Sequence, residues 1–352
     1  MFIEFSYAIS PQKTYDESCF LDSQAINYTN NQLQVIEPKY NEAIPLNLLR
    51  RMGRAVRLGV GGAMEMCIKN NLQPNAIIFS SAVGGLEDCI KFLNQIYVYE
   101  EGTLTPTNFV QSTPNAIAGS LALLTKNSSY NTTHVNGANS FLDALLDAQL
   151  LMNEGKTSSC LLGCVEEISS YNYNINQLAG LYKDTFISSL DLLKTKSKGS
   201  ICGEGAAMFY LSPHSQNYEA EIISFFTIQK NSSADEILEE IESMLNKENL
   251  EKNAISDLIL GYNGDQETQQ NYDSLSLFFE NSNIYAYKHL TGEYPTSVSF
   301  ALWMGIKLFK NKELPLSCIK KVSQNIREYV LIYNHYNSKE HSILLLKKGT
   351  RE

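Results

Sequence analysis

The stretch SFLDALLDAQLLMNEGKTSSCLLGCVEE, residues 140–167, combines an amphipathic helical pattern with a short apolar run. Phe141 and Leu145 begin a series of apolar residues at three- and four-residue spacing, which is typical of one face of a helix. Ser140 is a suitable N-cap for this helix, and Gly155 provides its stop signal. The apolar run that follows predicts a buried strand. A helix that leads into a buried strand is the repeating unit of parallel sheets.

Strand and helix patterns alternate along the rest of the chain. Apolar runs bounded by turn residues predict strands at 76–82, 203–212, 219–229, 257–262, 283–288, 329–336 and 341–348. Helical periodicity predicts helices at 49–67, 115–124, 234–247 and 297–310. Because strands joined by helices form parallel βαβ units, we expect an α/β fold in both halves of the chain. The polar segment 171–199 is expected to be a surface excursion between them.

Composition excludes several classes of function. The 352 residues carry 28 basic and 38 acidic side chains, a net charge of −10, and 43% of them are hydrophobic. An acidic chain without a run of Lys or Arg is not typical of a nucleic-acid-binding protein. Nowhere do 18 apolar residues follow one another, and the N-terminus MFIEFSYAIS lacks the pattern of a signal peptide. We therefore expect a soluble, cytoplasmic protein without a membrane span.

Cysteine usage and local motifs argue against disulfides, metals and nucleotides. The seven cysteines are odd in number and form no CxxC pair, and Cys160 and Cys164 are expected to be buried structural thiols. No His, Cys and Asp cluster has the spacing of metal ligands. The sequence AVGGLED at 82–88 lacks the Walker pattern, which favours a plain strand-to-helix turn. The sequence therefore predicts neither a metal nor a bound cofactor.

Four segments, in this order along the chain, resemble elements of β-ketoacyl synthases in the thiolase superfamily. They are 112–167, which is similar to the stretch that holds the nucleophile and its helix, GEGAAMFYLS at 203–212, ILGYNGDQETQQNYDSL at 259–275 and YKHLTGEYPTSVSFAL at 287–302. The ordered set is more specific than any one segment. It most resembles the short ketosynthase-like and chain-length-factor-like proteins of bacterial aryl polyene, flexirubin and dialkylresorcinol pathways.

This resemblance implies a thiolase-like fold, in which two duplicated βαβαβ halves form α-β-α-β-α layers. The halves would comprise residues 1–200 and 201–352. Ketosynthases of this family form dimers through an edge strand and a neighbouring helix. In this sequence these elements would be the strand 130–135 and the helix 115–124, whose small residues suit close helix packing.

The resemblance also implies which positions would carry the chemistry. A ketosynthase holds its acyl chain on a Cys thiolate at a helix N-terminus, and two His side chains assist decarboxylation and stabilise the enolate. Ala138 falls at the cysteine position, or Asn136 if the alignment shifts by two residues. The two histidine positions fall at Asn263 and Glu293, and Lys288 alone is retained. Since an ionised Glu293 would repel the enolate, the condensing site is predicted to be replaced.

Other polar residues are weaker candidates. Ser140 could act as a replacement nucleophile or contact substrate, and Thr113 and Asn115 could line the edge of an acyl pocket. His134 is expected on the strand before the nucleophile position. Structural or surface roles are favoured for the remaining histidines, and capping or subunit contacts for two acidic residues of the helix; these are His214, His289, His335, His341, Asp143 and Asp147. The loop NHYNSKEH at 334–341 has lost the glycines of the family's gating loop.

Three functions remain open. The leading hypothesis is a ketosynthase-like subunit without a Cys-His-His site, which pairs with an active ketosynthase, or with itself, and shapes the acyl pocket and chain length. An acyl carrier protein would supply its phosphopantetheine arm, and Arg50, Arg51, Arg54 and Arg57 form either a solvated face or its docking site. One alternative is a Cys-independent acyltransferase or malonyl decarboxylase that uses Asn263, Glu293 and Lys288. The other is a homodimeric, non-enzymatic scaffold. A thiol of Cys164 or Cys202 facing two imidazoles in one cleft would contradict the assignment of the catalytic positions to Ala138, Asn263 and Glu293.

Overall fold

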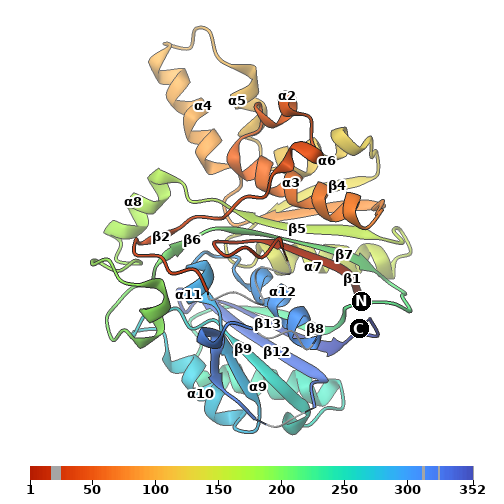
Figure 1. Cartoon of the computed structure of the whole chain (residues 1–352), viewed down its shortest axis with the longest axis vertical. Coiled ribbons are helices and arrows are strands. Elements are labelled where there is room, and N and C mark those ends of the chain that lie inside the picture. Colours follow the sequence, from red (N-terminus) through yellow and green to blue (C-terminus); the bar gives the residue numbers. More distant parts are fainter. Residues whose placement is uncertain (17–24, 311–313, 324–325, 352) are drawn as a thin grey trace.

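The computed structural model describes residues 1–16, 25–310, 314–323 and 326–351, and its strands form one large mixed sheet (Figure 1). The first set of strands is β1 (Phe2–Ile9), β3 (Ala76–Ser81), β4 (Tyr130–Val135), β5 (Cys160–Glu166) and β7 (Gly205–Ser212). The second set is β8 (Ala220–Gln229), β9 (Ile255–Leu260), β10 (Asn283–Ala286), β12 (Tyr329–Tyr336) and β13 (Glu340–Lys348). A short strand β11 (Ile319–Lys321) extends one edge, and β2 (Gln32–Leu33) pairs separately with β6 (Cys202–Gly203).

The strand order shows an internal duplication. The first set lies in the order β1-β7-β5-β3-β4, and the second set repeats it as β8-β13-β12-β9-β10. In each set, three strands are parallel and the other two are antiparallel to their neighbours. The sets join where β1 pairs with β8. The two related α/β halves are thus confirmed, and the strand order places their boundary between Ser212 and Ala220, beyond the predicted position near residue 200.

Helices cover both half-sheets and fill the space between them (Figure 1). The outer pair on the first half is α3 (Arg54–Lys69) and α6 (Ala116–Thr125), the central pair is α7 (Ser140–Asn153) and α12 (Val298–Phe309), and the outer pair on the second half is α9 (Ala234–Lys247) and α10 (Gln270–Phe278). The remaining helices are α2 (Leu46–Leu49), α4 (Leu86–Val98), α5 (Pro106–Gln111), α8 (Ser170–Leu178) and α11 (Lys288–Thr291). This arrangement is the predicted α-β-α-β-α layering.

Three apolar cores correspond to these layers. The central core contains Phe141 of α7, Phe209 of β7 and Trp303 of α12, all of them buried. Every residue of α12 is buried, because this helix lies between the two half-sheets. Separate cores pack around Val60 beneath α3 and around Ile241 beneath α9. Since a helix that is apolar on all sides must be buried on all sides, the sequence of α12 suits only a central layer.

Several local predictions need correction. Asn139, not Ser140, is the N-cap of α7, and the Ser140 hydroxyl donates to the Gly137 carbonyl oxygen at 2.8 Å. The segment 171–199 is not merely a surface excursion, because Lys183 and Leu192 in it are buried. The other local predictions agree: Cys160 and Cys164 are buried and free, and the Gly-rich turn at 82–88 leads directly into α4. Within the described residues, no helix is long and apolar enough to cross a membrane.

Candidate functional site

A backbone crossing brings the two halves together at the carboxyl ends of their parallel strands. The Glu293 amide donates to the Ile201 carbonyl oxygen at 2.7 Å, and the Gly203 amide donates to the Glu293 carbonyl oxygen at 3.0 Å. Gly292 has a φ of +73°, and a Cβ on Gly203 would lie 2.0 Å from the Thr291 carbonyl oxygen. The backbone at 201–203 and the backbone at 291–293 thus approach each other so closely that both positions require glycine. This contact places the Glu293 side chain in the protein interior.

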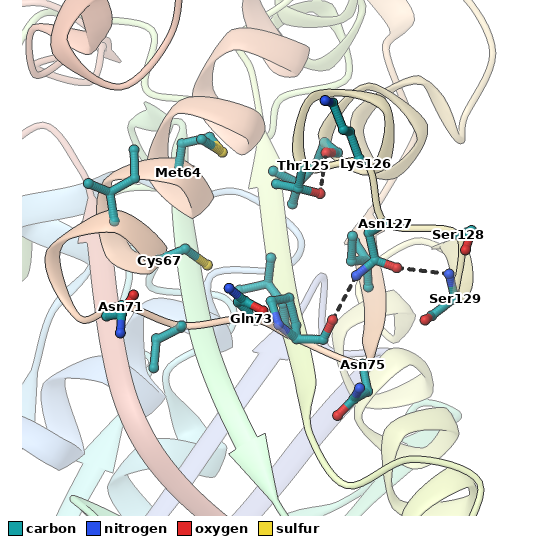
Figure 2. Close-up of a pocket in the computed structure, with 16 residues that line it drawn as sticks. Met64, Cys67, Asn71, Gln73, Asn75, Thr125, Lys126, Asn127, Ser128 and Ser129 are labelled. Carbon is teal, nitrogen blue, oxygen red and sulfur yellow. Dashed lines mark hydrogen bonds between the residues drawn. The ribbon is translucent and has the colours of Figure 1, made fainter.

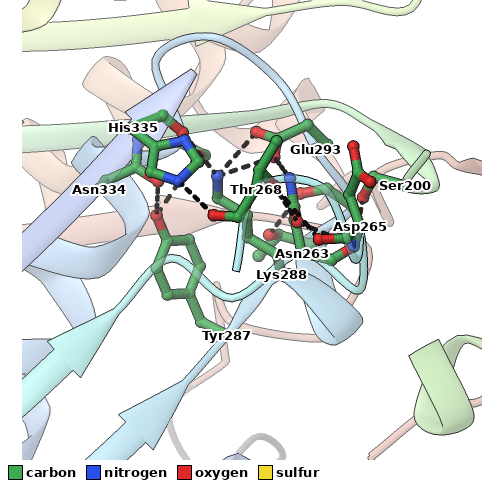
Figure 3. Close-up of polar contacts among 12 residues, drawn as sticks. Ser200, Asn263, Asp265, Thr268, Tyr287, Lys288, Glu293, Asn334 and His335 are labelled. Atoms are coloured by element: carbon green, nitrogen blue, oxygen red, sulfur yellow. Dashed lines mark hydrogen bonds and ion pairs between the residues drawn. The ribbon is translucent and has the colours of Figure 1, made fainter. Parts of the chain in front are cut away.

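Lys288, Glu293 and Asn263 form a closed hydrogen-bonded cluster (Figure 3). The Lys288 Nζ lies 2.8 Å from each carboxylate oxygen of Glu293, and the Asn263 Nδ2 donates to Glu293 Oε2 at 2.8 Å. The Lys288 Nζ also donates to the His335 carbonyl oxygen at 3.3 Å. Burial raises the pKa of Glu293 and lowers the pKa of Lys288. The Glu293 carboxylate is thus hydrogen-bonded to the Lys288 ammonium group and the Asn263 side-chain amide.

The residues around this cluster hold it in place through hydrogen bonds to the backbone and to Asn263. The Ser200 hydroxyl donates to the Asn263 carbonyl oxygen at 2.7 Å, and Asn263 Oδ1 accepts from the Asp265 amide at 3.0 Å. His335 Nε2 lies 3.0 Å from the Thr268 carbonyl oxygen, while its Nδ1 accepts from the Ser338 amide (Figure 3). Burial and the nearby Lys288 cation lower the pKa of His335 to about 3. His335 is therefore a neutral, structural histidine.

The other histidines and the basic helix also have structural partners. His289 is buried with Nε2 3.1 Å from the Ser317 hydroxyl, and burial lowers the pKa of its imidazole to about 4. His341 lies between the Tyr333 hydroxyl and the Lys230 carbonyl oxygen, and His214 lies in the turn after β7. On α3, Arg54 pairs with Glu204 and Arg57 pairs with Glu37, so only Arg50 and Arg51 of the basic set are exposed.

An acidic cavity of about 50 Å³ adjoins the cluster. Its lining includes Glu293, Cys202 and two glutamates at the end of β5, Glu166 and Glu167. Burial raises the pKa of both β5 glutamates to about 7 and the pKa of the Cys202 thiol to about 12. The described lining residues include four tyrosines and no histidine: Tyr173, Tyr182, Tyr294 and Tyr336. The space is small, and the raised pKa keeps the Cys202 thiol protonated.

The position predicted for the nucleophile lies at the start of α7. The Gly137 amide donates to the carbonyl oxygen of Ala82, a residue of the cavity wall, which places this turn next to the cavity. The Ala138 amide donates to Glu340 Oε1 at 3.1 Å. In the alternative register, the Asn136 Nδ2 donates to Asp143 Oδ2 at 2.7 Å. Neither position carries a thiol.

The structure does not bring the predicted pocket-edge residues to this cluster. Thr113 and Asn115 are exposed before α6, and Asn115 hydrogen-bonds to Asn131 and Thr133 on β4. His134, also on β4, lies 2.9 Å from the Asp147 carboxylate of α7. All these contacts hold β4 against its flanking helices and lie on the outer edge of the sheet.

That edge is apolar and open. Among the described residues, β4 pairs only with β3, so its other side has no strand neighbour. We call the surface around it the β4 face; it consists of the exposed side chains Leu123, Tyr130, Val135, Leu146 and Leu150. Leu123 is 84% exposed, and Tyr97 on the projecting helix α4 is 87% exposed (Figure 1). An unpaired strand edge flanked by exposed apolar side chains is a surface on which another chain can add a strand.

A second cavity, of about 650 Å³, lies between α3 and α6 (Figure 2). Met64 and Cys67 contribute to an apolar floor, and Lys126 and Asn127 lie on a polar rim. The Asn127 Nδ2 donates to the Pro74 carbonyl oxygen at 2.7 Å, which closes one side. This cavity lies at the amino ends of β3 and β4, opposite the acidic cavity, whereas ligands of parallel sheets bind at the carboxyl ends.

Sequence reasoning missed four residues of the site: Glu166, Glu167, Tyr336 and Glu340. A signal for the first two was present, because paired glutamates directly follow a buried strand in CLLGCVEE. Tyr336 and Glu340 flank the turn between β12 and β13 and reach the site only through the fold. No local pattern marks them.

Comparisons with known proteins agree with this architecture. Residues 24–198 match the family model described as the N-terminal domain of β-ketoacyl synthase. Three similar structures are the ishigamide ketosynthase/chain length factor, a β-ketoacyl synthase from Burkholderia phymatum STM815, and the ketosynthase ApeO in complex with its chain length factor ApeC from Xenorhabdus doucetiae. Their sequence identities are 13%, 15% and 14%; each has a TM-score of 0.76, with 99% of this chain and 98% of the other covered. No curated protein matches the sequence.

Proposed function

We propose that this chain is a non-condensing subunit of the ketosynthase and chain-length-factor type, because residues 24–198 match the β-ketoacyl synthase family model and the whole chain shares its fold with such proteins. It pairs with an active β-ketoacyl synthase, completes the acyl pocket of that partner and limits chain length in fatty acid, polyene or polyketide biosynthesis. An acyl carrier protein presents the growing chain on its phosphopantetheine arm. A packing partner needs the fold and the interface, but not the thiolate.

The observation that carries this proposal is the closed Lys288–Glu293–Asn263 cluster. Condensation needs donors aimed at a developing negative charge, whereas here a carboxylate occupies the second histidine position and is satisfied by its own neighbours. Ala138 supplies no nucleophile, and the adjoining cavity of about 50 Å³ is lined by three glutamates. The glutamates oppose binding of an anionic malonyl group, and the missing nucleophile opposes loading of an acyl chain.

The β4 face supports the pairing part of the proposal. Its five apolar side chains surround an unpaired strand edge, and the pocket-edge candidates Thr113 and Asn115 lie beside it. Among similar structures, ApeO forms a complex with its chain length factor ApeC. A strand added to β4 by a partner would satisfy the free backbone groups of this edge and bury the face.

Charges introduced on the β4 face are expected to abolish pairing. Leu123 and Leu146 lie on the two helices that flank β4, and both are exposed in the isolated chain. The double variant Leu123→Asp/Leu146→Asp should therefore fold normally, but bind a co-expressed neighbouring ketosynthase at least about tenfold more weakly, because two carboxylates would be desolvated at the interface. The measurement is size-exclusion chromatography of the co-purified proteins.

Leu316→Asp provides the matched control, since Leu316 is 85% exposed and lies in the other half of the chain. It should leave a one-to-one complex intact. Equal retention of the complex by both variants would contradict the assigned interface. A wild-type chain that forms only homodimers and binds no ketosynthase would instead support a scaffold and refute the subunit function.

The second candidate function is a Cys-independent acyl transfer or malonyl decarboxylation. One observation favours it. Asn263 lies 30 residues before Glu293 in the sequence, yet it meets Glu293 and Lys288 in one buried cluster beside a cavity. The test is decarboxylation of malonyl carrier protein by the isolated chain, with no turnover expected. Turnover that the isosteric variant Glu293→Gln abolishes would overturn the subunit reading in favour of this enzyme.

A further inference from the structure

A carboxylate from the far end of the chain lies against the start of α7. Glu340, the first residue of β13, accepts a hydrogen bond from the Ala138 amide at 3.1 Å, although the two residues are 202 positions apart. Gly137 has a φ of +57°, and a Cβ on it would lie 2.6 Å from Glu340 Oε1. The carboxylate thus packs directly on the peptide unit that joins Gly137 to Ala138.

The hairpin that carries Glu340 holds it in place. Tyr336 and Glu340 pair across the hairpin, and the turn between them passes through Asn337 and Ser338, both with positive φ. The Lys339 amide closes this turn by donating to the Tyr336 carbonyl oxygen at 3.2 Å. Glu340 is half-buried, and the start of a 14-residue helix favours an anion there.

The same geometry is unfavourable for a nucleophilic thiol at position 138. A thiolate at a helix N-terminus gains from the amides and the helix dipole, but a carboxylate already bonded to the amide of that residue offsets this gain and repels the thiolate. It would also repel the oxygen of a tetrahedral intermediate formed there. The loss of the sulfur and the presence of Glu340 are therefore two separate obstacles at one position.

We propose that the Glu340 carboxylate prevents thiolate and acyl-thioester chemistry at position 138. A cysteine installed there alone would therefore not be reactive. This inference deepens the proposed function and rests on its assignment of position 138. Glu340 would then prevent condensation chemistry together with Ala138, Asn263 and Glu293, the residues at the three catalytic positions.

The test compares Ala138→Cys with Ala138→Cys/Glu340→Gln. Glutamine keeps the size of the side chain and an oxygen for the Ala138 amide, but removes the charge. Iodoacetamide alkylation of the installed thiol is followed by peptide-resolved mass spectrometry across pH 6–10. We expect alkylation at pH 7.5 to be at least about tenfold faster in the double variant, since a tenfold change corresponds to one pKa unit of the thiol.

Other charged and titratable groups around position 138 are the same in both variants. They are Asp143 on α7, bonded to Asn136; Glu166 on β5, bonded to the Ala82 amide; and Tyr336 on β12. Ala138→Cys/Lys339→Gln removes an exposed charge from the same hairpin and serves as the matched control, with a rate expected within about twofold of Ala138→Cys.

Equal alkylation rates and pH midpoints with and without the Glu340 charge would overturn the proposal. Thermal melting shows whether each variant is folded, and Glu340→Ala in the same cysteine background replaces the glutamine variant if that one does not fold. Alkylation needs no ketosynthase partner. If removal of the Glu340 charge speeds alkylation but the protein never binds a ketosynthase, only the proposed function is refuted. If the protein binds a ketosynthase but the alkylation rates are equal, only the role of Glu340 is refuted.

Discussion

Replacing Lys288 with alanine is expected to lower the free energy of unfolding by about 3–5 kcal/mol, because it leaves the Glu293 carboxylate buried without its counter-charge. Both side chains are buried, and the Lys288 Nζ lies 2.8 Å from each oxygen of that carboxylate. The Asn263 amide alone cannot replace a full positive charge. Urea denaturation followed by circular dichroism measures the loss.

Two controls separate this effect from a simple loss of contacts. The double variant Lys288→Met/Glu293→Leu removes both charges together and should recover most of the lost stability, since a buried ion pair is worth little more than apolar residues of similar volume. Lys194→Ala breaks an exposed ion pair with Asp191, whose N–O distance is 2.7 Å, and should leave the free energy of unfolding almost unchanged. A Lys288→Ala protein as stable as the Lys194→Ala protein would show that the buried carboxylate has another source of compensation.

Gly203→Ala is expected to destabilise the protein by about 3 kcal/mol, at the upper end of overpacking effects. The added Cβ would lie 2.0 Å from the Thr291 carbonyl oxygen and 2.6 Å from the Gly292 Cα. Both contacts are with backbone, so no side-chain rotation can relieve them. The crossing between the two halves would have to open, and with it the position of Glu293. Urea denaturation again gives the change in free energy.

Gly119→Ala is the matched control for this substitution. Gly119 lies within α6, and a Cβ there would meet only the side-chain Nδ2 of Asn115, at 4.0 Å. Alanine should therefore stabilise the protein by about 0.5–1 kcal/mol through helix propensity. If Gly203→Ala also proved neutral or stabilising, the tight backbone crossing would not exist in solution.

Elements with strong local signals were predictable from the sequence. Helix α9 spans Ala234–Lys247 as predicted, because Ser233 and Glu236 form a capping box and its apolar residues recur with helical spacing. Strands β5 and β7 also agree, since a buried strand needs only a short apolar run between turn residues. In these cases local sequence and tertiary environment favour the same structure.

Elements that depend on tertiary contacts were missed. Strand β1 lies at the centre of the sheet between β7 and β8, but no strand was predicted in the N-terminal stretch MFIEFSYAIS. Helix α4 was predicted only through the strand-to-helix turn at 82–88, and its extent was missed. It packs little of its surface, and the contact of Phe92 with Phe109 of α5, with ring centroids 5.4 Å apart, holds it to a neighbour that the sequence did not indicate.

The candidate site, too, was partly predictable from the sequence. The ordered motifs predicted the positions of Asn263, Lys288 and Glu293, and the structure brings these three together. The sequence could not indicate that they neutralise one another, because their contact depends on the turn at Gly292. Nor could it indicate Glu340, whose contact with Ala138 joins residues from opposite halves of the chain.

The closed Lys288–Glu293–Asn263 cluster has a consequence for molecular evolution. An imidazole in place of Glu293 would remove the only carboxylate within 4 Å of the Lys288 ammonium group among the described residues, and thus create an unpaired buried cation. A thiol in place of Ala138 would first meet the Glu340 anion. Each of these single substitutions is thus expected to give a less stable or an unreactive protein, which only simultaneous changes would avoid. Under the proposed function, these two contacts make a gain of carbon–carbon bond formation depend on several simultaneous substitutions.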